Sequence, residues 1–231
     1  PRTSKENIQS LIRKYGAESN VVRVRVYGEF PLQEDDVFIP LEWIERSIKT
    51  DPDEDTAKAL GLYYDENGEK VIDKSGVHSI DIGCDVARFG DDRTCIGYKI
   101  NEVAKMHKKY NGQDTTWTAG KIVQLFLNLV EFYGFTGNVD VKIDDGGVGG
   151  GVTDQLKEVK RRDPERFRQM TIWPIHFGQP IRHKNYYDTT TYMMGVIREM
   201  IQPFDKAGTP RQPTLILADD DDLRGQLSCH S

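Results

Sequence analysis

Two segments decide the fold: Ser79-Ile80-Asp81-Ile82-Gly83-Cys84-Asp85-Val86-Ala87 and Val139-Asp140-Val141-Lys142-Ile143-Asp144-Asp145. Each is a short apolar run that ends in acidic residues, which is typical of a buried strand reaching the surface at one end. A carboxylate inside a sheet is costly unless something neutralises it. Two such carboxylates from distant parts of the chain suggest a divalent cation between them, and hence metal-assisted phosphate chemistry.

Alternation along the first segment places Asp81, Gly83 and Asp85 on one face of the strand. Asp85 is the preferred metal ligand because it lies toward the carboxyl end, whereas we expect Asp81 to be paired or partly solvated. Asp144 is the corresponding ligand in the second segment. The alternatives are a turn-capping role for Asp85 and an Asx-turn for Asp144. Asp145 is as suited to fixing the following loop as to contacting a metal.

The elements around these segments alternate in a way that predicts an α/β fold with a mixed sheet and helices on both faces. Helix propensity, capping residues and glycines set the expected bounds. We expect the carboxyl ends of strands 78–87 and 139–143 to lie side by side, where ligands bind in open α/β sheets. The other expected strands are 94–100, 103–110, 171–175 and 214–217, and the expected helices are 114–133, 152–161, 186–201 and 220–228.

The first part of the chain is less regular. We expect a polar helix over 1–20, a half-exposed strand over 21–27 and a helix over 41–48, followed by an acidic, loop-rich connector over 49–76. A domain boundary is placed near residue 76. Residues 1–76 are then an extension or linker, and residues 77–231 form the main domain.

Composition narrows the class of protein. The 231 residues are 37% hydrophobic and 29% charged, with a net charge of −6, and no apolar run approaches the roughly 20 residues of a membrane span. The acidic balance counts against a nucleic-acid coat protein but not against a metal-dependent nuclease, whose carboxylates are offset by cations. No signal peptide is expected at the N-terminus, and three cysteines without a C-x-x-C pair indicate a reducing, cytoplasmic setting.

Several common motifs are excluded. The glycine run 146–151 lacks the last glycine of a dinucleotide fingerprint because residue 152 is Val, and no Walker A sequence occurs. Residues 51–62 imitate a calcium loop but lack its glycine and its closing glutamate. The five histidines show no zinc-ligand spacing.

Two further segments carry charge. The run Arg182-His183-Lys184-Asn185-Tyr186-Tyr187 combines basic and aromatic residues and suits either a nucleic-acid backbone or a solvated approach to a helix. The run Asp219–Asp222 suits a solvated helix N-terminus or, alternatively, one more metal ligand.

The sequence resembles the nuclease portion of bacteriophage terminase large subunits. Residues 82–94, IGCDVARFGDDRT, resemble the family's first catalytic motif, and residues 143–156, IDDGGVGGGVTDQL, resemble its second. Residues 24–31 and 38–44 resemble the segment that joins the packaging ATPase to the nuclease. The ATPase motifs themselves are absent from this chain.

The resemblance implies an RNase H-like fold, with three antiparallel strands followed by parallel strands, and cleavage of concatemeric viral DNA. Asp85 and Asp144 carry over as metal-binding catalytic carboxylates. The family's third acid usually lies in an Asp-Ala-Leu or Asp-Asp-Leu segment near the end of the domain. Asp222, before Leu223, is a superficial match, and we expect the true third motif beyond Ser231, which would leave the domain C-terminally incomplete. The implied partners are double-stranded DNA, the terminase small subunit and the portal protein, in the cytoplasm of the infected bacterium.

The function expected from the sequence is therefore a DNA endonuclease that uses two Mg²⁺ or Mn²⁺ ions. Asp85 and Asp144 hold the ions, Asp145 and Asp222 are candidate additional acids, and Arg88, Arg93 and Lys184 are candidate contacts to the phosphate backbone. One alternative is a non-catalytic DNA-docking module. The other is an actin-like or sugar-kinase-like phosphotransferase, which is disfavoured because the chain shows no duplicated domain.

Overall fold

The computed structural model describes residues 5–17, 22–28, 37–49, 57–58, 61–64, 66, 70–87 and 93–229. The chain divides into two compact units, and one of the two division points falls within a helix. The sheet unit comprises residues 52–195, and the terminal unit comprises residues 1–51 together with 196–231. The domain boundary near residue 76 stays a prediction.

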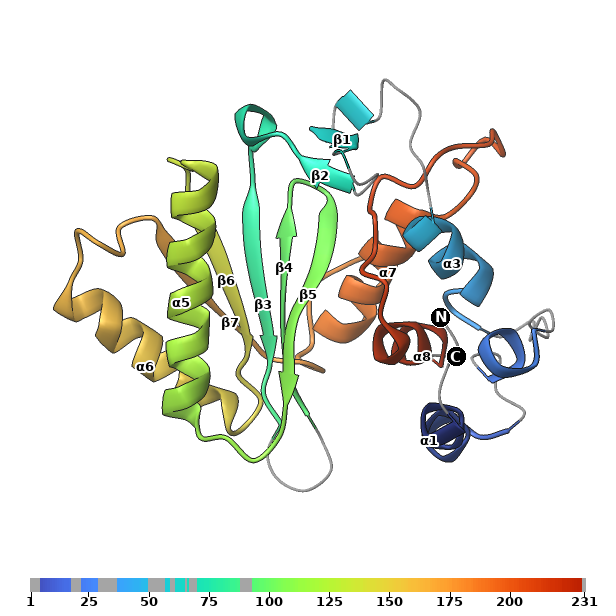
Figure 1. The fold of residues 1–231 in the computed structure, drawn as a ribbon, viewed down its shortest axis with the longest axis horizontal. Coiled ribbons are helices and arrows are strands. Elements are labelled where there is room, and N and C mark those ends of the chain that lie inside the picture. The colour runs from blue at the N-terminus through green and yellow to red at the C-terminus, as the bar shows by residue number, and fades with distance from the viewer. Residues whose placement is uncertain are drawn as a thin grey trace. The chain divides into compact units, whose positions relative to one another are not determined.

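A five-stranded mixed sheet forms the centre of the sheet unit, in the order β5-β4-β3-β6-β7 (Figure 1). The first three strands of that order pair antiparallel, whereas β6 pairs parallel with β3 and with β7. This is the arrangement that the resemblance implied, so the expected fold class is confirmed. The strands are β3 (Ile80–Asp85), β4 (Thr94–Ile100), β5 (Val103–Tyr110), β6 (Val139–Asp144) and β7 (Met170–Ile175).

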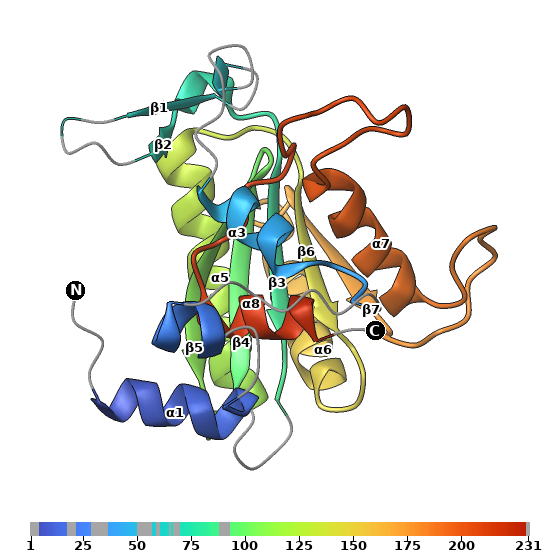
Figure 2. The ribbon, with the colours of Figure 1, turned by 90° about the vertical axis from the view of Figure 1, so that its right-hand side faces the viewer.

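Two helices, α5 (Thr115–Tyr133) and α6 (Gly149–Arg162), lie together along one face of the sheet (Figures 1 and 2). The predicted caps of α5 are confirmed, because Asp114 accepts a hydrogen bond from the Trp117 amide at 2.7 Å and Gly134 ends the helix in a left-handed conformation. Phe132, in the last turn of α5, is 59% exposed and lies under the Lys74 ammonium. None of the described helices is both long and apolar enough to cross a bilayer.

The two faces of the sheet differ in polarity because side chains alternate along each strand. One face of β3 and β6 carries Ile80, Ile82, Cys84, Val139, Val141 and Ile143, all of which are buried. The other face carries the polar partners of the same register, including Asp81 beside Asp140. Burial of the apolar side chains against α5 and α6 stabilises the sheet unit, and the polar side chains lie on the opposite face of the sheet.

A small hairpin of β1 (Leu62–Tyr64) and β2 (Lys70–Ile72) precedes the main sheet and is followed by the 3₁₀ turn η2 (Lys74–Gly76). Asn101 ties this region to the sheet, since its side chain accepts from the His78 amide at 2.9 Å and donates to the Gly76 carbonyl at 2.9 Å. These bonds set where β3 begins.

The terminal unit contains α1 (Lys5–Tyr15), the π-helical segment η1 (Arg23–Tyr27), α3 (Leu41–Lys49), the second part of α7 (Thr189–Ile201) and α8 (Asp221–Ser228). Its centre is Arg224, whose side chain is only 2% exposed and pairs with Glu45 and Asp219, both at 2.6 Å. Burial alone would raise the pKa of Glu45, but hydrogen bonds from Lys49 and Arg224 outweigh burial and lower it. A buried arginine is tolerated here because both carboxylates neutralise it.

Two expected strands of this unit are wrong. Residues 23–27 form a π-helical segment, and Arg25 of that segment pairs with Asp221 at 2.7 Å. An alternating pattern needs a neighbouring strand, and within the described residues neither sheet offers one to this segment. Residues 214–217 also belong to neither sheet. Their apolar side chains are buried, and the Ser47 hydroxyl replaces ladder bonds by donating to the Leu215 carbonyl and accepting from the Leu217 amide.

The loop that follows β6 is short because α6 begins directly above the end of the strand. A Cβ atom on Gly149 would lie 1.6 Å from the Asp144 carbonyl oxygen, so the helix can start there only with glycine. Helix α6 accordingly begins three residues earlier than the sequence predicted. The same glycine run therefore serves backbone packing.

We predict that Gly149→Ala destabilises the sheet unit by about 1–3 kcal/mol or more, because the new methyl group must displace backbone. Gly150→Ala is the matched control: its Cβ would meet nothing closer than an Asp145 oxygen at 3.8 Å, and alanine favours a helix. Urea denaturation of both variants measures the difference. Equal stability of the two variants would show that α6 does not approach β6 as described.

Candidate active site

Asp85 and Asp144 lie at the same edge of the sheet, on neighbouring strands. The parallel ladder of β3 and β6 pairs Cys84 with Ile143, and the two aspartates are the next residue on each strand. Neighbouring strands are about 5 Å apart, so the two carboxylates emerge side by side and on the polar face. The expected meeting of the two strand ends is thus confirmed, while the roles of the two acids stay predictions.

The acids after β6 are held by local hydrogen bonds. Asp144 Oδ1 accepts from the Gly146 amide at 2.9 Å, which is the Asx-turn that sequence reasoning kept as an alternative. Asp145 Oδ1 accepts from the Thr153 hydroxyl on α6 at 2.6 Å. One oxygen of each carboxylate therefore orients the side chain, and the second oxygen is left to meet a further partner.

Histidine 176 is a member of this edge that sequence reasoning missed. It follows the last residue of β7, and its Nε2 lies 3.8 Å from Asp145 Oδ2. The position of His176 could have revealed it, because the residue directly follows β7, which runs parallel to β6 and ends at the same edge of the sheet. No motif spacing marks it. The carboxyl ends of β3, β6 and β7 together present Asp85, Asp144, Asp145 and His176.

Below this edge, the remaining acids of the polar face are already paired. Asp81 binds the Lys142 ammonium and lies 3.3 Å from the Lys99 ammonium, as expected for a paired residue. Asp140 accepts from the Trp173 indole nitrogen at 2.9 Å. Asp81 and Asp140 thus have protein partners on the face of the sheet and differ in this from acids that could bind a cation at the strand ends.

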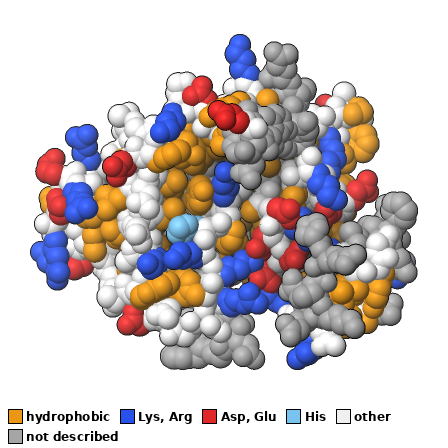
Figure 3. Space-filling view, viewed as in Figure 1, with side chains coloured by type: hydrophobic (Ala, Val, Ile, Leu, Met, Phe, Trp, Pro, Cys, Tyr) orange, Lys and Arg blue, Asp and Glu red, His pale blue; other side chains and the backbone are white. Residues whose placement is uncertain are grey.

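The candidate phosphate contacts are spread over three segments. Arg88 lies outside the described residues. Arg93 directly precedes β4 and so lies at the edge where β3 ends, because Asp85 pairs with Cys95. Lys184 is exposed on the loop between β7 and α7. On the face drawn in Figure 3, Lys and Arg side chains form separate groups among acidic and apolar ones.

Asp222 belongs to the terminal unit, whereas Asp85 and Asp144 belong to the sheet unit. Its carboxylate pairs with the Lys14 ammonium. The neighbouring Asp220 caps α8 by accepting from the Leu223 amide at 2.9 Å, which confirms the helix-terminal role expected for this acidic run. Within the described residues, no group of three or more His, Cys, Asp or Glu side chains has the geometry of a metal site.

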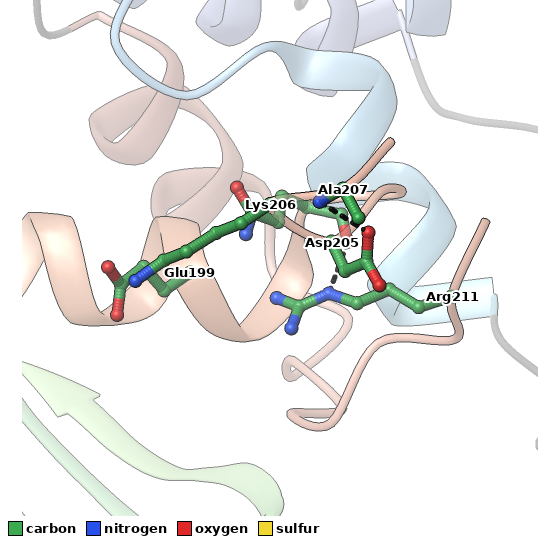
Figure 4. Close-up of a pocket in the computed structure, with 6 residues that line it drawn as sticks. Glu199, Asp205, Lys206, Ala207 and Arg211 are labelled. Carbon is green, nitrogen blue, oxygen red and sulfur yellow. Dashed lines mark hydrogen bonds between the residues drawn. The ribbon is translucent and has the colours of Figure 1, made fainter. Parts of the chain in front are cut away.

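A pocket of about 400 Å³ lies elsewhere, in the terminal unit (Figure 4). Asp205 at its rim accepts from the Ala207 and Thr209 amides, both at 2.8 Å, and the Arg211 guanidinium donates to the Gln202 carbonyl at 3.2 Å. These bonds close the turn on itself. None of the candidate site residues lines the pocket.

Cys84 reports on the surroundings of the two acids from the buried face. Burial, with smaller effects from Asp85, Cys95 and Asp144, raises the pKa of its thiol to about 12. The thiol is therefore neutral at physiological pH, and it is a core group without nucleophilic character.

This pKa predicts a pH dependence. The thiol of the unfolded chain ionises near pH 9, whereas the folded one ionises only near 12. The buried, neutral Cys84 thiol therefore contributes fully to the free energy of unfolding below pH 9. That contribution is lost as the pH rises from 9 to about 12, because in this range only the unfolded state releases the proton. At about pH 10 the wild type should have lost roughly 1 kcal/mol of its free energy of unfolding through this ionisation, whereas Cys84→Val, which has no thiol, should not show that loss; urea denaturation measures both. Cys229→Val, which replaces an exposed cysteine, should show the loss as the wild type does, and an equal slope in both variants would contradict the burial of Cys84.

Comparisons with known proteins come from structure alone. No family model matches the sequence, and no curated protein matches it. Among solved structures, the chain is similar to the nuclease domain of the large terminase subunit gp2 of bacterial virus Sf6, with 13% identity and a TM-score of 0.49 over 83% of this chain and 80% of that chain.

Two structures of a mutant of that large terminase subunit are similar to the same degree. One, solved with manganese and beta-thujaplicinol, has 14% identity and a TM-score of 0.49 over 83% of this chain and 80% of that one. The other, solved with calcium, has 13% identity and a TM-score of 0.49 over 83% and 81%. All three of these solved structures come from the large terminase subunit of bacterial virus Sf6, and two of them are described as its nuclease domain.

Proposed function

We propose that this chain is a metal-dependent DNA endonuclease of a viral genome-packaging terminase, which cuts concatemeric double-stranded DNA. The observation that carries the proposal is the adjacency of Asp85 and Asp144 at the carboxyl ends of β3 and β6. Two carboxylates at one sheet edge repel each other unless a cation lies between them. That is the arrangement required for metal-assisted hydrolysis of a phosphodiester.

The donor set fits a small, hard divalent cation. Mg²⁺ prefers oxygen ligands and commonly takes one or two carboxylates from the protein, with the rest of its shell supplied by water and substrate phosphate. Asp85 and Asp144 supply such a pair, and hydrogen bonding of Asp144 Oδ1 to the Gly146 amide orients its other oxygen. We propose that these two residues hold two Mg²⁺ or Mn²⁺ ions. Bound cations of this kind polarise a phosphate and lower the pKa of a bound water.

The side chains around the acids have positioning roles in this proposal. Thr153 fixes Asp145 through its 2.6 Å hydrogen bond, and Asp145 in turn faces His176. Arg88, Arg93 and Lys184 contact the phosphate backbone and bring the scissile bond to the sheet edge. No protein nucleophile takes part, because the nearest thiol, Cys84, is buried and un-ionised.

Other features of the proposal come from the family resemblance. Asp145 and Asp222 are candidate additional acids, and Asp222 would have to exchange its Lys14 partner for a cation. The third acid of the family is proposed to lie beyond Ser231. The proposed partners are double-stranded DNA, a terminase small subunit and a portal protein, and the proposed setting is the host cytoplasm.

We predict that Asp85→Asn reduces metal-dependent nicking of supercoiled plasmid by about a hundredfold or more, since loss of one charged group at a reacting centre costs several kcal/mol. Asp81→Asn is the matched control, on the same strand and face but already paired with Lys142 and Lys99. It should keep nicking within a few-fold of the wild type. Equal nicking by the Asp85 variant would remove Asp85 from the catalytic role.

Metal binding tests the site independently of cleavage. We expect Mn²⁺ to bind the wild-type chain in a calorimetric or paramagnetic titration, and Asp144→Asn to weaken that binding at least about tenfold, because a carboxylate ligand is replaced by a neutral amide. A chelator should abolish nicking, and added Mg²⁺ or Mn²⁺ should restore it. Retention of DNA without any metal-dependent cleavage would favour the docking-module alternative.

A further inference from the structure

Exposed aromatic side chains are frequent in the segment that runs from β7 through the following loop into α7. Eight large apolar side chains stand out as exposed in the described part of the chain, and four of them fall within residues 173–192. They are Trp173, Phe177, Tyr187 and Tyr192, with Tyr187 the most exposed at 79%. Phe177 and Tyr187 lie on the loop between β7 and α7, whereas Trp173 belongs to β7 and Tyr192 to α7. An exposed aromatic ring on a loop offers a ligand a flat apolar face.

The loop between β7 and α7 has an ordered backbone that is held by hydrogen bonds. Residues 179–189 form a hairpin-like turn closed by a bridge between Pro180 and Asp188, with the Ile181 amide donating to the Tyr187 carbonyl at 3.1 Å. The Thr189 hydroxyl donates to the His176 carbonyl at 2.6 Å. In Figure 2 the loop stands out from the ribbon beside α7. The backbone of the loop is thus held by its own hydrogen bonds.

A stack of rings already exists within the loop. His183 lies 4.9 Å from Tyr186, centroid to centroid, with only 25° between the ring planes. Tyr186 also meets Tyr192 edge-on at 5.8 Å. A Cβ atom on Gly195 would lie 2.2 Å from the Tyr186 ring, so glycine at this position of α7 is what allows the tyrosine to lie flat on the helix. His183 is exposed, and its ring also lies 5.4 Å from the Tyr192 ring, so the three rings form one cluster at the surface.

Charge indicates the class of ligand. Residues 176–187 contain Arg182 and Lys184 and no Asp or Glu, although the whole chain has a net charge of −6. Basic side chains that alternate with stacking aromatics bind the backbone and bases of single-stranded nucleic acid. Paired bases inside a duplex are already stacked on their neighbours and cannot use such a surface.

The position of the loop connects it to the candidate site. The loop starts at His176, whose imidazole faces Asp145, and Asp145 follows Asp144. The loop therefore begins at the sheet edge that carries the acids, and a strand passed from the loop to that edge would meet them. This step rests on the proposed function, whereas binding of the strand by the loop does not.

We propose that Tyr187 and the His183–Tyr186 stack form a base-stacking platform for an unpaired DNA strand, with Arg182 and Lys184 neutralising its phosphates. The platform holds one strand of a locally opened duplex beside the acids. In this scheme the unpaired strand, and not the intact duplex, is the form of DNA that the loop recognises.

The test compares two probes of equal charge in a chelator, so that no cleavage occurs. One is a labelled deoxythymidine oligonucleotide of about 12 nucleotides, and the other is an abasic strand of the same length. Fluorescence anisotropy should show wild-type protein binding the thymidine strand at least about tenfold more tightly, because one or more stacked bases contribute. Tyr187→Ala and His183→Ala should each lower that preference several-fold, and Tyr187→Phe should keep it.

Phe132→Ala is the matched control, since Phe132 is another strongly exposed aromatic residue but lies at the C-terminal end of α5. It should leave the preference for bases unchanged. Equal wild-type affinity for both probes, or an unchanged preference in Tyr187→Ala, would overturn the platform. A base preference without any plasmid nicking would leave the platform standing and defeat the nuclease; nicking without a base preference would do the reverse.

Discussion

The parallel pairing of β3 with β6 is the constraint on which the site depends. Because the ladder ends with Cys84 opposite Ile143, the next residue on each strand is an aspartate, and both aspartates face the polar side. A shift of the ladder by one residue would turn one of them toward the helices and separate the pair. The apolar residues of both strands, buried against α5 and α6, hold the register. Core packing and chemistry are thus set by the same alternation.

The turn after β6 shows how tightly the backbone is drawn around this edge. Gly149 lets α6 start against the Asp144 carbonyl, Gly146 satisfies the Asp144 side chain, and Thr153 reaches back to Asp145. These two glycines therefore allow close backbone packing and a side-chain hydrogen bond, which explains why glycines occur here although the run matches no nucleotide-binding fingerprint. A helix seated this closely also points its N-terminus toward the same edge, where its dipole favours anions.

Sequence reasoning succeeded where local chemistry and periodicity agreed. Asp114 and Gly134 mark the ends of α5 because a side-chain cap and a left-handed glycine act within a few residues of their own position. It failed over residues 23–27 and 214–217, whose apolar patterns suit a strand but whose partners are the Arg224 network and the Ser47 hydroxyl.

What the sequence by itself determined is the set of strands and helices around the sheet and the two aspartates that end its central strands. These follow from interactions between residues near one another in the chain. Only the tertiary structure decided that Asp81 and Asp140 are paired, that His176 faces Asp145 and that Tyr186 lies on Gly195. Each of these contacts joins residues from different elements, so it depends on how strands and helices come together. Local patterns in the sequence carry no information about contacts between residues that are far apart along the chain.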